Sequence, residues 1–387
     1  MKKNKGLFLS HVDDASGAPK ALSNILKFIL TQYKIDIDIF VCQPKTLGFF
    51  ENLENNQNNK GSVKVEYLKQ KKKSSIFLIR KFESLFDRKI AKIRVNKNLK
   101  SYHENYDFIF FNSISYNFLK TDLDKITIPK YLYLHEGSFF LFEYIKGDYS
   151  IFDKFDHIFV PSKQVAKNLI HYGIPENKIT LLQLFLNDDE INGSKSSILK
   201  NENFVVGNLA YLHAGKGIEY FLATAKLYKE LYPNDKIIFK WKGCNPETSL
   251  FKLTNSEIQN AGLEDVVFLE EYSDDTSYFF SEIDVLLMTS KQETFGYVVL
   301  EAANSCSPSI VFDEVIGASE FVKEYGGLVA EYLSINQLAI YLKKYYDNRN
   351  MLISDGNLAN KLLKEDYFLN EKLKNDLKAK LSIIISK

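Results

Sequence analysis

Short apolar runs alternate with amphipathic segments along most of this chain. Runs of about four to eight apolar residues between turn-forming residues are typical of strands buried on both faces of a parallel sheet. Elsewhere apolar residues recur at helical spacing, as Leu22, Leu26 and Ile29 do. The alternation predicts an α/β fold with mostly parallel sheets. Strands are expected at residues 6–10, 35–42, 63–68, 106–111, 130–134, 157–161, 179–182, 204–209, 237–242, 266–269, 284–288 and 309–312, and helical patterns at 163–172, 298–303 and from about 335 onward.

One polar segment divides the chain. Residues 187–203, NDDEINGSKSSILKNEN, are rich in turn formers and carry little apolar periodicity, which is typical of a linker. A chain of 387 residues is long enough for two domains with well-developed cores. The sequence therefore predicts two αβ domains, one on each side of this linker.

The stretch from Met288 to Glu320 has the most informative pattern. It begins where a buried strand is expected to end, places Glu293, Phe295 and Gly296 in a turn, and continues into a helical run that contains Glu301. A strand, a short loop and a helix N-terminus form a common binding place for phosphorylated ligands. Carboxylates repel phosphate, however, so two glutamates favour a neighbouring group rich in hydroxyls, such as a sugar.

Two other turns carry candidate ligand contacts. Lys216 lies between two glycines directly before a helical run, where it can reach a phosphate with little obstruction. The spacing differs from that of a P-loop, and a lysine between glycines is also common in ordinary turns. Ser16, Gly17 and Ala18 open the first helical pattern, with Ser16 as a candidate cap and small residues that let a ligand approach the backbone. An ordinary strand-to-helix turn is the alternative interpretation.

Polar residues also follow two strands of the first half. Asn112 follows the strand expected at 106–111, and His135 follows the one expected at 130–134. Open α/β sheets bind their ligands outside the carboxyl ends of the strands, so both residues are candidate contacts. A lone histidine is also often structural.

Charge is unevenly distributed along the chain. The formal net charge is only +1, which gives no case for a nucleic-acid binder. Residues 69–100, however, contain 12 Lys and Arg against Glu83 and Asp87, a local excess of ten positive charges. Apolar residues recur there at helical spacing, so the segment is either a basic helix on an anionic membrane or a surface helix packed on its own sheet.

The sequence gives little sign of secretion or of a membrane span. The three cysteines are far apart and odd in number, so neither a disulfide framework nor a metal site follows, and a reducing cytoplasm is favoured. The N-terminal apolar run is too short for a signal peptide, and no run approaches the length that a bilayer requires.

Together these features resemble a known enzyme family. The two glutamates, Glu293 and Glu301, are separated by seven residues, as in the GT-B glycosyltransferases of retaining family 4, also called group 1. The resemblance covers nearly the whole chain and is strongest from Val205 to Val329. It implies two Rossmann-like αβα domains facing a central cleft. The expected domains are residues 1–190 for the acceptor, 191–365 for a nucleotide-sugar donor, and a C-terminal helix at 366–387 that packs back on the first.

The resemblance also implies roles for single residues. Lys216 would contact the donor diphosphate and Glu293 the hydroxyls of the transferred sugar, while Glu301 would hold the ribose. The donor set is then Tyr211, Lys216, Glu293, Thr294, Phe295, Gly296 and Glu301. On the acceptor side the matching residues are Ser16, Gly17, Ala18, Asn112 and His135, and the catalytic set is His135, Lys216 and Glu293.

The chain departs from the family pattern beside the loop lysine. The family often has an arginine a few residues before it, where Tyr211 stands here, which leaves Lys242 as a candidate second cation. The family's glycine-rich pair is reduced to Gly317-Ala318. These departures bear on donor identity more than on activity.

The implied reaction is transfer of a sugar, with retention of configuration, from a nucleotide-diphosphate donor to a glycan or lipid-linked acceptor of cell-surface polysaccharide synthesis. No cofactor or metal ion is expected, and a UDP-sugar is favoured slightly over a GDP-sugar. A cytoplasmic enzyme, peripheral on the inner face of the membrane through residues 69–100, is expected. A phosphorylase or epimerase with the same fold, or a non-catalytic nucleotide-sugar-binding partner, are the alternatives.

Overall fold

The chain folds into two compact units. The first comprises Met1–Gln183 together with Asp376–Lys387, and the second comprises Leu184–Asn375. The computed structural model describes residues 4–14, 16–43, 49–67, 104–115, 123–187, 190, 203–273, 276–313 and 317–385. The basic segment 69–100 and most of the linker 187–203 lie outside these residues.

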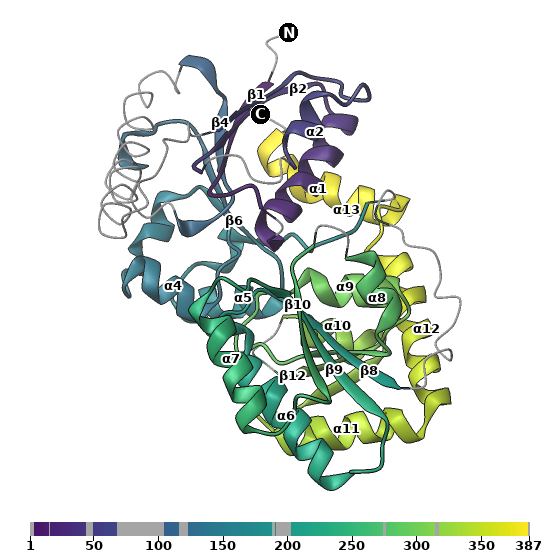
Figure 1. Cartoon of the computed structure of the whole chain (residues 1–387). Coiled ribbons are helices and arrows are strands. Elements are labelled where there is room, and N and C mark those ends of the chain that lie inside the picture. Colours follow the sequence, from purple (N-terminus) through teal and green to yellow (C-terminus); the bar gives the residue numbers. More distant parts are fainter. Residues whose placement is uncertain are drawn as a thin grey trace. The chain divides into compact units, whose positions relative to one another are not determined.

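The first unit is built on a seven-stranded parallel sheet (Figure 1). Its strand order is β3-β2-β1-β4-β5-β6-β7. The strands are β1 (Asn4–Ser10), β2 (Ile35–Val41), β3 (Val63–Tyr67), β4 (Phe108–Phe111), β5 (Lys130–Tyr133), β6 (His157–Val160) and β7 (Ile179–Leu181). The helices are α1 (Gly17–Gln32), α2 (Glu51–Glu54), α4 (Ser138–Ile145) and α5 (Lys163–His171), with short 3-10 turns at Leu123–Lys125, Tyr149–Lys154 and Glu176–Lys178.

The second unit repeats this plan with six parallel strands in the order β10-β9-β8-β11-β12-β13. They are β8 (Phe204–Leu209), β9 (Ile237–Cys244), β10 (Val267–Glu271), β11 (Val285–Met288), β12 (Ser309–Phe312) and β13 (Gly327–Ala330). The helices are α6 (Ile218–Leu231), α7 (Ser249–Asn260), α8 (Ser277–Glu282), α9 (Tyr297–Asn304), α10 (Ala318–Tyr325), α11 (Ile335–Asp347) and α12 (Arg349–Asp366). A 3-10 turn, η6 (Ala214–Lys216), precedes α6.

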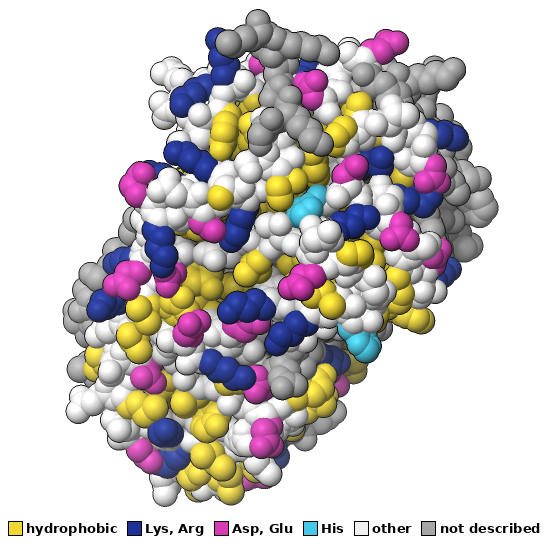
Figure 2. All heavy atoms as spheres, turned by 180° about the vertical axis from the view of Figure 1, so that it is seen from behind, with side chains coloured by type: hydrophobic (Ala, Val, Ile, Leu, Met, Phe, Trp, Pro, Cys, Tyr) yellow, Lys and Arg dark blue, Asp and Glu magenta, His cyan; other side chains and the backbone are white. Residues whose placement is uncertain are grey.

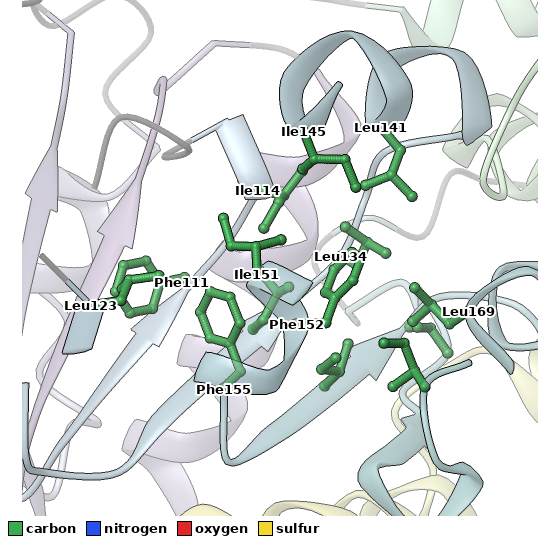
Figure 3. Packing of buried hydrophobic residues seen from close by; sticks show 14 of the residues in the cluster. Phe111, Ile114, Leu123, Leu134, Leu141, Ile145, Ile151, Phe152, Phe155 and Leu169 are labelled. Carbon is green, nitrogen blue, oxygen red and sulfur yellow. The ribbon is translucent and has the colours of Figure 1, made fainter. Parts of the chain in front are cut away.

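Apolar side chains cover both faces of the first sheet. Phe111 and Leu134 lie in a buried cluster with Phe152, Phe155 and further residues from α4 and the 3-10 turn before β6 (Figure 3). On the opposite face, aromatic rings from neighbouring strands meet, as Phe8 and Phe110 do at 5.1 Å between ring centroids. Because a parallel sheet is covered on both sides, its strands are nearly continuous apolar runs, which is why the sequence pattern locates them.

Several elements escape the sequence pattern. The apolar run of β13 is short and begins at two glycines with positive φ, Gly326 and Gly327. The helix α4, sequence SFFLFEYI, is apolar on nearly all sides and shows no clear helical face. α4 begins at Ser138, three residues after His135, and so ends the turn that follows β5.

The last helix, α13 (Glu371–Ile385), ends in the first unit. The hydroxyl of Tyr131 on β5 donates a hydrogen bond to the carbonyl oxygen of Ile383 at 2.9 Å. The chain therefore enters the first unit a second time.

None of the helices within the described residues has the length and apolar character that a bilayer span requires. Acidic and basic side chains are intermixed on the face seen in Figure 2.

Each sheet reverses its strand order at one place. In the first unit β1 pairs with both β2 and β4, and in the second unit β8 pairs with both β9 and β11. Helices leave in opposite directions at such a switch point, which opens a crevice at the carboxyl ends of the two strands. Ligand contacts are therefore expected from the residues that follow β1 and β4 in the first unit, and β8 and β11 in the second.

Candidate functional site

The turn before α6 is held by close backbone contacts. Gly217 has a φ of +72°, and a Cβ atom there would lie 2.0 Å from the carbonyl oxygen of Thr289. The Thr289 hydroxyl donates to the carbonyl oxygen of Gly217 at 2.9 Å, and the amide of Lys291 donates to that of Gly215 at 2.9 Å. Only glycine combines this conformation with this approach. The turn after β8 is thereby fixed against the loop after β11.

This approach brings Lys216 and Glu293 together. The two side chains form an ion pair with 34% and 17% of their surfaces exposed, although 77 positions separate them in sequence. An ion pair that is mostly covered by protein is less screened than one in open water. The pair therefore places a cation and a carboxylate side by side at the switch point of the second sheet.

The start of α9 adds backbone groups next to this pair. Gly296 is its N-cap residue with a φ of +88°, and a Cβ atom there would lie 3.2 Å from the Cγ of Glu293. The side chain of Phe295 is only 4% exposed and packs 5.9 Å from the ring of Tyr367. Burial of Phe295 anchors the loop, so its backbone and the glutamate are presented at the N-terminus of α9, where amide groups favour anionic ligands.

The other residues predicted to contact the donor lie near the same edge of the second sheet. Thr294 is in the loop with Glu293, and Glu301 is partly exposed in the second turn of α9. Tyr211 is 45% exposed and stacks on Tyr272, with ring centroids 5.5 Å apart.

The candidate second cation already has an acidic neighbour. Lys242 lies on β9, 3.7 Å from the carboxylate of Glu270 on β10, and Lys240 contacts Glu270 and Glu282 at 3.3 Å and 3.0 Å. These ion pairs join β9 to the edge strand β10 and to the end of α8. A phosphate-binding role for Lys242 would require it to exchange this partner.

In the first unit the strand ends bring Asn112 and His135 together. The Nδ2 of Asn112 donates to the carbonyl oxygen of Ala18 at 2.8 Å, which leaves its Oδ1 to accept from the Nε2 of His135 at 3.1 Å. This network assigns the His135 proton to Nε2 and the lone pair to Nδ1. Burial and the nearby His11 imidazole lower the pKa of His135 to about 3, so the ring is neutral at pH 7.

Ser16 occupies the expected cap position of α1, but its side chain does not cap the helix. Instead its hydroxyl and its amide both donate to the carboxylate of Asp14, at 2.5 Å and 3.0 Å. The hydroxyl therefore donates to a local carboxylate, and no helix amide donates to its oxygen. Gly17 lies exposed at the first position of α1, next to Ala18, whose carbonyl holds Asn112.

Two polar residues near His135, Ser113 and Glu136, were missed by the sequence reasoning. The hydroxyl of Ser113 donates to the carboxylate of Glu136, which also accepts from the amide of His135 at 3.1 Å. Burial raises the pKa of Glu136. The turn after β5 is therefore tied to the turn after β4. The available signal was position, because Ser113 and Glu136 also follow strand ends.

The third missed residue is His11. It follows β1 directly, and its Nδ1 atom is buried without a hydrogen-bond partner among the residues that the structure describes. The signal that singled out His135, a histidine directly after a strand, applies equally here.

Solved structures with the same architecture define the fold class. Anabaena HepE, determined in complex with UDP and glucose, superposes with a TM-score of 0.77 at 19% identity over 98% of this chain and 99% of its own. Sucrose-phosphate synthase from Thermosynechococcus elongatus superposes with a TM-score of 0.77 at 16% identity over 100% of both chains. The chain has the GT-B glycosyltransferase fold, as expected.

Sequence comparison narrows the class for the second unit. Residues 189–362 match the family model described as "Glycosyl transferases group 1", so this segment carries the sequence pattern of that family. It contains the Gly215–Gly217 turn and both glutamates. The expected resemblance is confirmed at this level.

Curated relatives match over a part of their length. The O-antigen biosynthesis glycosyltransferase WclY of Escherichia coli is 28% identical over 152 residues, and a second WclY sequence is 30% identical over 153. An uncharacterized glycosyltransferase of Haemophilus influenzae is 23% identical over 174 residues. The matches cover 39% to 45% of this chain and 38% to 48% of these relatives.

Proposed function

We propose that this chain is a glycosyltransferase that moves a sugar from a nucleotide-diphosphate donor to a glycan or lipid-linked acceptor in the synthesis of a cell-surface polysaccharide. The observation that carries the proposal is the Lys216–Glu293 ion pair beside the N-terminus of α9, within the segment that matches the group 1 family model. The similarity to WclY, an O-antigen biosynthesis enzyme, supports the polysaccharide context.

The charges of the pair fit the two halves of such a donor. A diphosphate needs a cation and backbone amides, which Lys216 and the N-terminus of α9 supply. The transferred sugar offers hydroxyl donors, and the carboxylate of Glu293 is an acceptor for them. Donor binding then replaces one ion pair by two matched contacts: the ammonium turns to the diphosphate while the carboxylate receives hydroxyls.

In the reaction, an acceptor hydroxyl bonds to the anomeric carbon and gives its proton to the departing nucleoside diphosphate. The bond from the anomeric carbon to the diphosphate oxygen breaks, and negative charge develops on that oxygen. Lys216 and the helix amides stabilise this charge, and their contribution is larger where water is excluded. Glu293 orients the sugar and does not attack it. We propose retention of anomeric configuration, a metal-independent step, and UDP-sugars as the first donors to test. HepE, which was solved with UDP and glucose, supports that order. Action in the cytoplasm, with residues 69–100 on an anionic membrane, completes the proposal.

The test is a transfer assay on single variants. Purified protein is incubated with UDP-, GDP- and ADP-sugars and with lipid-linked or free glycan acceptors, and release of nucleoside diphosphate is followed with and without acceptor. Glu293→Ala and Lys216→Met are expected to lower kcat/KM at least about 100-fold, which corresponds to about 2.7 kcal/mol of transition-state stabilisation. NMR of the product reports the anomeric configuration, and chelator treatment tests the metal independence.

A matched control separates the site from general charge effects. Lys229 pairs with Asp265 at 2.5 Å near the C-terminal end of α6, away from the Gly215–Gly217 turn. Lys229→Met also removes a lysine from an ion pair of the same unit, and it is expected to leave transfer unchanged. Unchanged transfer by Glu293→Ala at saturating donor would contradict the assignment. Dependence on inorganic phosphate in place of an acceptor would identify a phosphorylase instead.

A further inference from the structure

His11 occupies the switch point of the first sheet and has no assigned role. It follows β1, the strand at which the order of the sheet reverses, so it lies at the mouth of the crevice between β1 and β4. Its Nδ1 atom is buried and lacks a hydrogen-bond partner among the described residues. Buried polar atoms are nearly always paired, so an unpaired one calls for a ligand or another explanation.

The backbone around His11 is held on both sides. The hydroxyl of Ser10 donates to the carbonyl oxygen of Val12 at 2.7 Å, which closes a tight bend over His11. The carboxylate of Asp13 accepts from the amide of Phe49 at 3.0 Å and from the hydroxyl of Tyr67 at 2.5 Å. The loop is thus fixed by one internal hydrogen bond and by contacts to two other segments, and this turn holds the backbone of His11 in place.

The same turn lies beside the acceptor-side pair. The amide of Asn112 donates to the carbonyl oxygen of Leu9 at 3.0 Å, only two residues before His11. His11 is also near enough to His135 to influence its pKa. The two imidazoles and the side-chain amide of Asn112 therefore form one cluster of polar side chains at the carboxyl ends of β1, β4 and β5.

The charge state of His11 selects the kind of ligand. Burial lowers the pKa of His11 to about 4, against the opposite influence of Asp14, so the ring is neutral at pH 7. A neutral imidazole offers an anion no positive charge, but each of its nitrogens forms one hydrogen bond, as donor or acceptor. A hydroxyl can both donate and accept, so it satisfies Nδ1 in either tautomer.

We propose that His11 binds a sugar hydroxyl of the substrate through Nδ1 and so acts with His135 as a second imidazole of the acceptor-side site. The proposal rests on the glycosyltransferase function proposed above. The hydroxyl comes either from the acceptor glycan or from the transferred sugar of the donor, and kinetics distinguish these two sources.

The experiment compares two replacements of His11. Asparagine places an amide close to the position of Nδ1 and keeps the hydrogen bond, whereas leucine fills similar space without polar atoms. His11→Leu is expected to lower kcat/KM about 30-fold or more, and His11→Asn to recover at least about tenfold of that loss. An increased KM for the acceptor alone assigns the hydroxyl to the acceptor. An increased KM for the donor, with unchanged affinity for the free nucleoside diphosphate, assigns it to the transferred sugar.

Stability provides an independent readout. Leucine removes an unpaired buried nitrogen, so His11→Leu is expected to keep or raise the melting temperature while activity falls. His171, exposed at the end of α5, is the matched control, and His171→Asn should change neither quantity.

Three results would overturn the assignment. Wild-type activity in His11→Leu would remove His11 from the site while leaving the glycosyltransferase function intact. Equal losses in His11→Leu and His11→Asn together with a lower melting temperature would show a structural role. No transfer and no nucleotide binding by the wild type would overturn the proposed function itself, and this assignment with it.

Discussion

Replacement of Gly217 by alanine tests the backbone contact that holds the turn before α6. The φ of Gly217 is +72°, and a Cβ atom would lie 2.0 Å from the carbonyl oxygen of Thr289. Real Cβ atoms approach no closer than about 3 Å, so one of the two segments must move by roughly 1 Å. Gly262 is a matched control, because its φ of +63° is similar and nothing lies within 4 Å of its Cβ position.

The magnitude follows from the difference between the two sites. Alanine in the left-handed conformation costs about 1–2 kcal/mol at either position. At Gly217 the shift also breaks two hydrogen bonds, from the Thr289 hydroxyl to Gly217 and from the Lys291 amide to Gly215, each with a net worth of about 1 kcal/mol. Gly217→Ala is therefore expected to destabilise the second unit by about 3–4 kcal/mol, roughly 2 kcal/mol more than Gly262→Ala.

The assay uses the only tryptophan of the chain. Trp241 is fully buried on β9 in the second unit, and its indole nitrogen donates to the carbonyl oxygen of Ala210 at 2.8 Å. Its fluorescence during urea unfolding therefore reports this unit. Gly217→Ala should lower the midpoint more than Gly262→Ala and should also weaken binding of the nucleoside diphosphate. Equal midpoints for the two variants would refute the close approach between the turn and Thr289.

Further predictions concern stability, protonation and membrane binding. Asp284→Ala should destabilise the second unit by about 2–3 kcal/mol, because this buried carboxylate accepts from the amide of Val205 at 2.7 Å. The control is Asp265→Ala at an exposed ion pair, which should cost under about 1 kcal/mol in the same urea assay. The ring of His135 should remain neutral at pH 5 by NMR. Below pH 6.5 the unfolded chain binds a proton at His135 that the native state does not bind. The free energy of unfolding should therefore fall by about 1.4 kcal/mol per pH unit as the pH drops from 6.5 toward 3. Titration of the His135 ring near pH 6.5 would contradict this prediction. Reversing the charges of residues 71–73 should weaken binding to anionic vesicles, and equal binding in a co-sedimentation assay would remove the membrane proposal.

Local pattern was sufficient for much of the fold. The strands β1, β8 and β12 were located to within about two residues because strands of a covered parallel sheet are short apolar runs that polar residues bound. The elements β13 and α4 escaped because their burial depends on neighbours distant in sequence. The same limit applies to Ser16, whose cap position was predictable but whose hydroxyl prefers the carboxylate of Asp14.

The sequence by itself determined the parts of the candidate site: a lysine between glycines, two glutamates around a helix start, and a histidine, His135, after a strand. Which of these meet was decided only by the tertiary structure. Lys216 and Glu293 pair across 77 positions because β8 and β11 are neighbours in the sheet and Gly217 permits the turns to touch. Likewise, His11 became a candidate only when packing left its Nδ1 buried and unpaired among the described residues. Periodicity records how each segment meets the core, whereas side-chain pairing depends on which strands lie side by side.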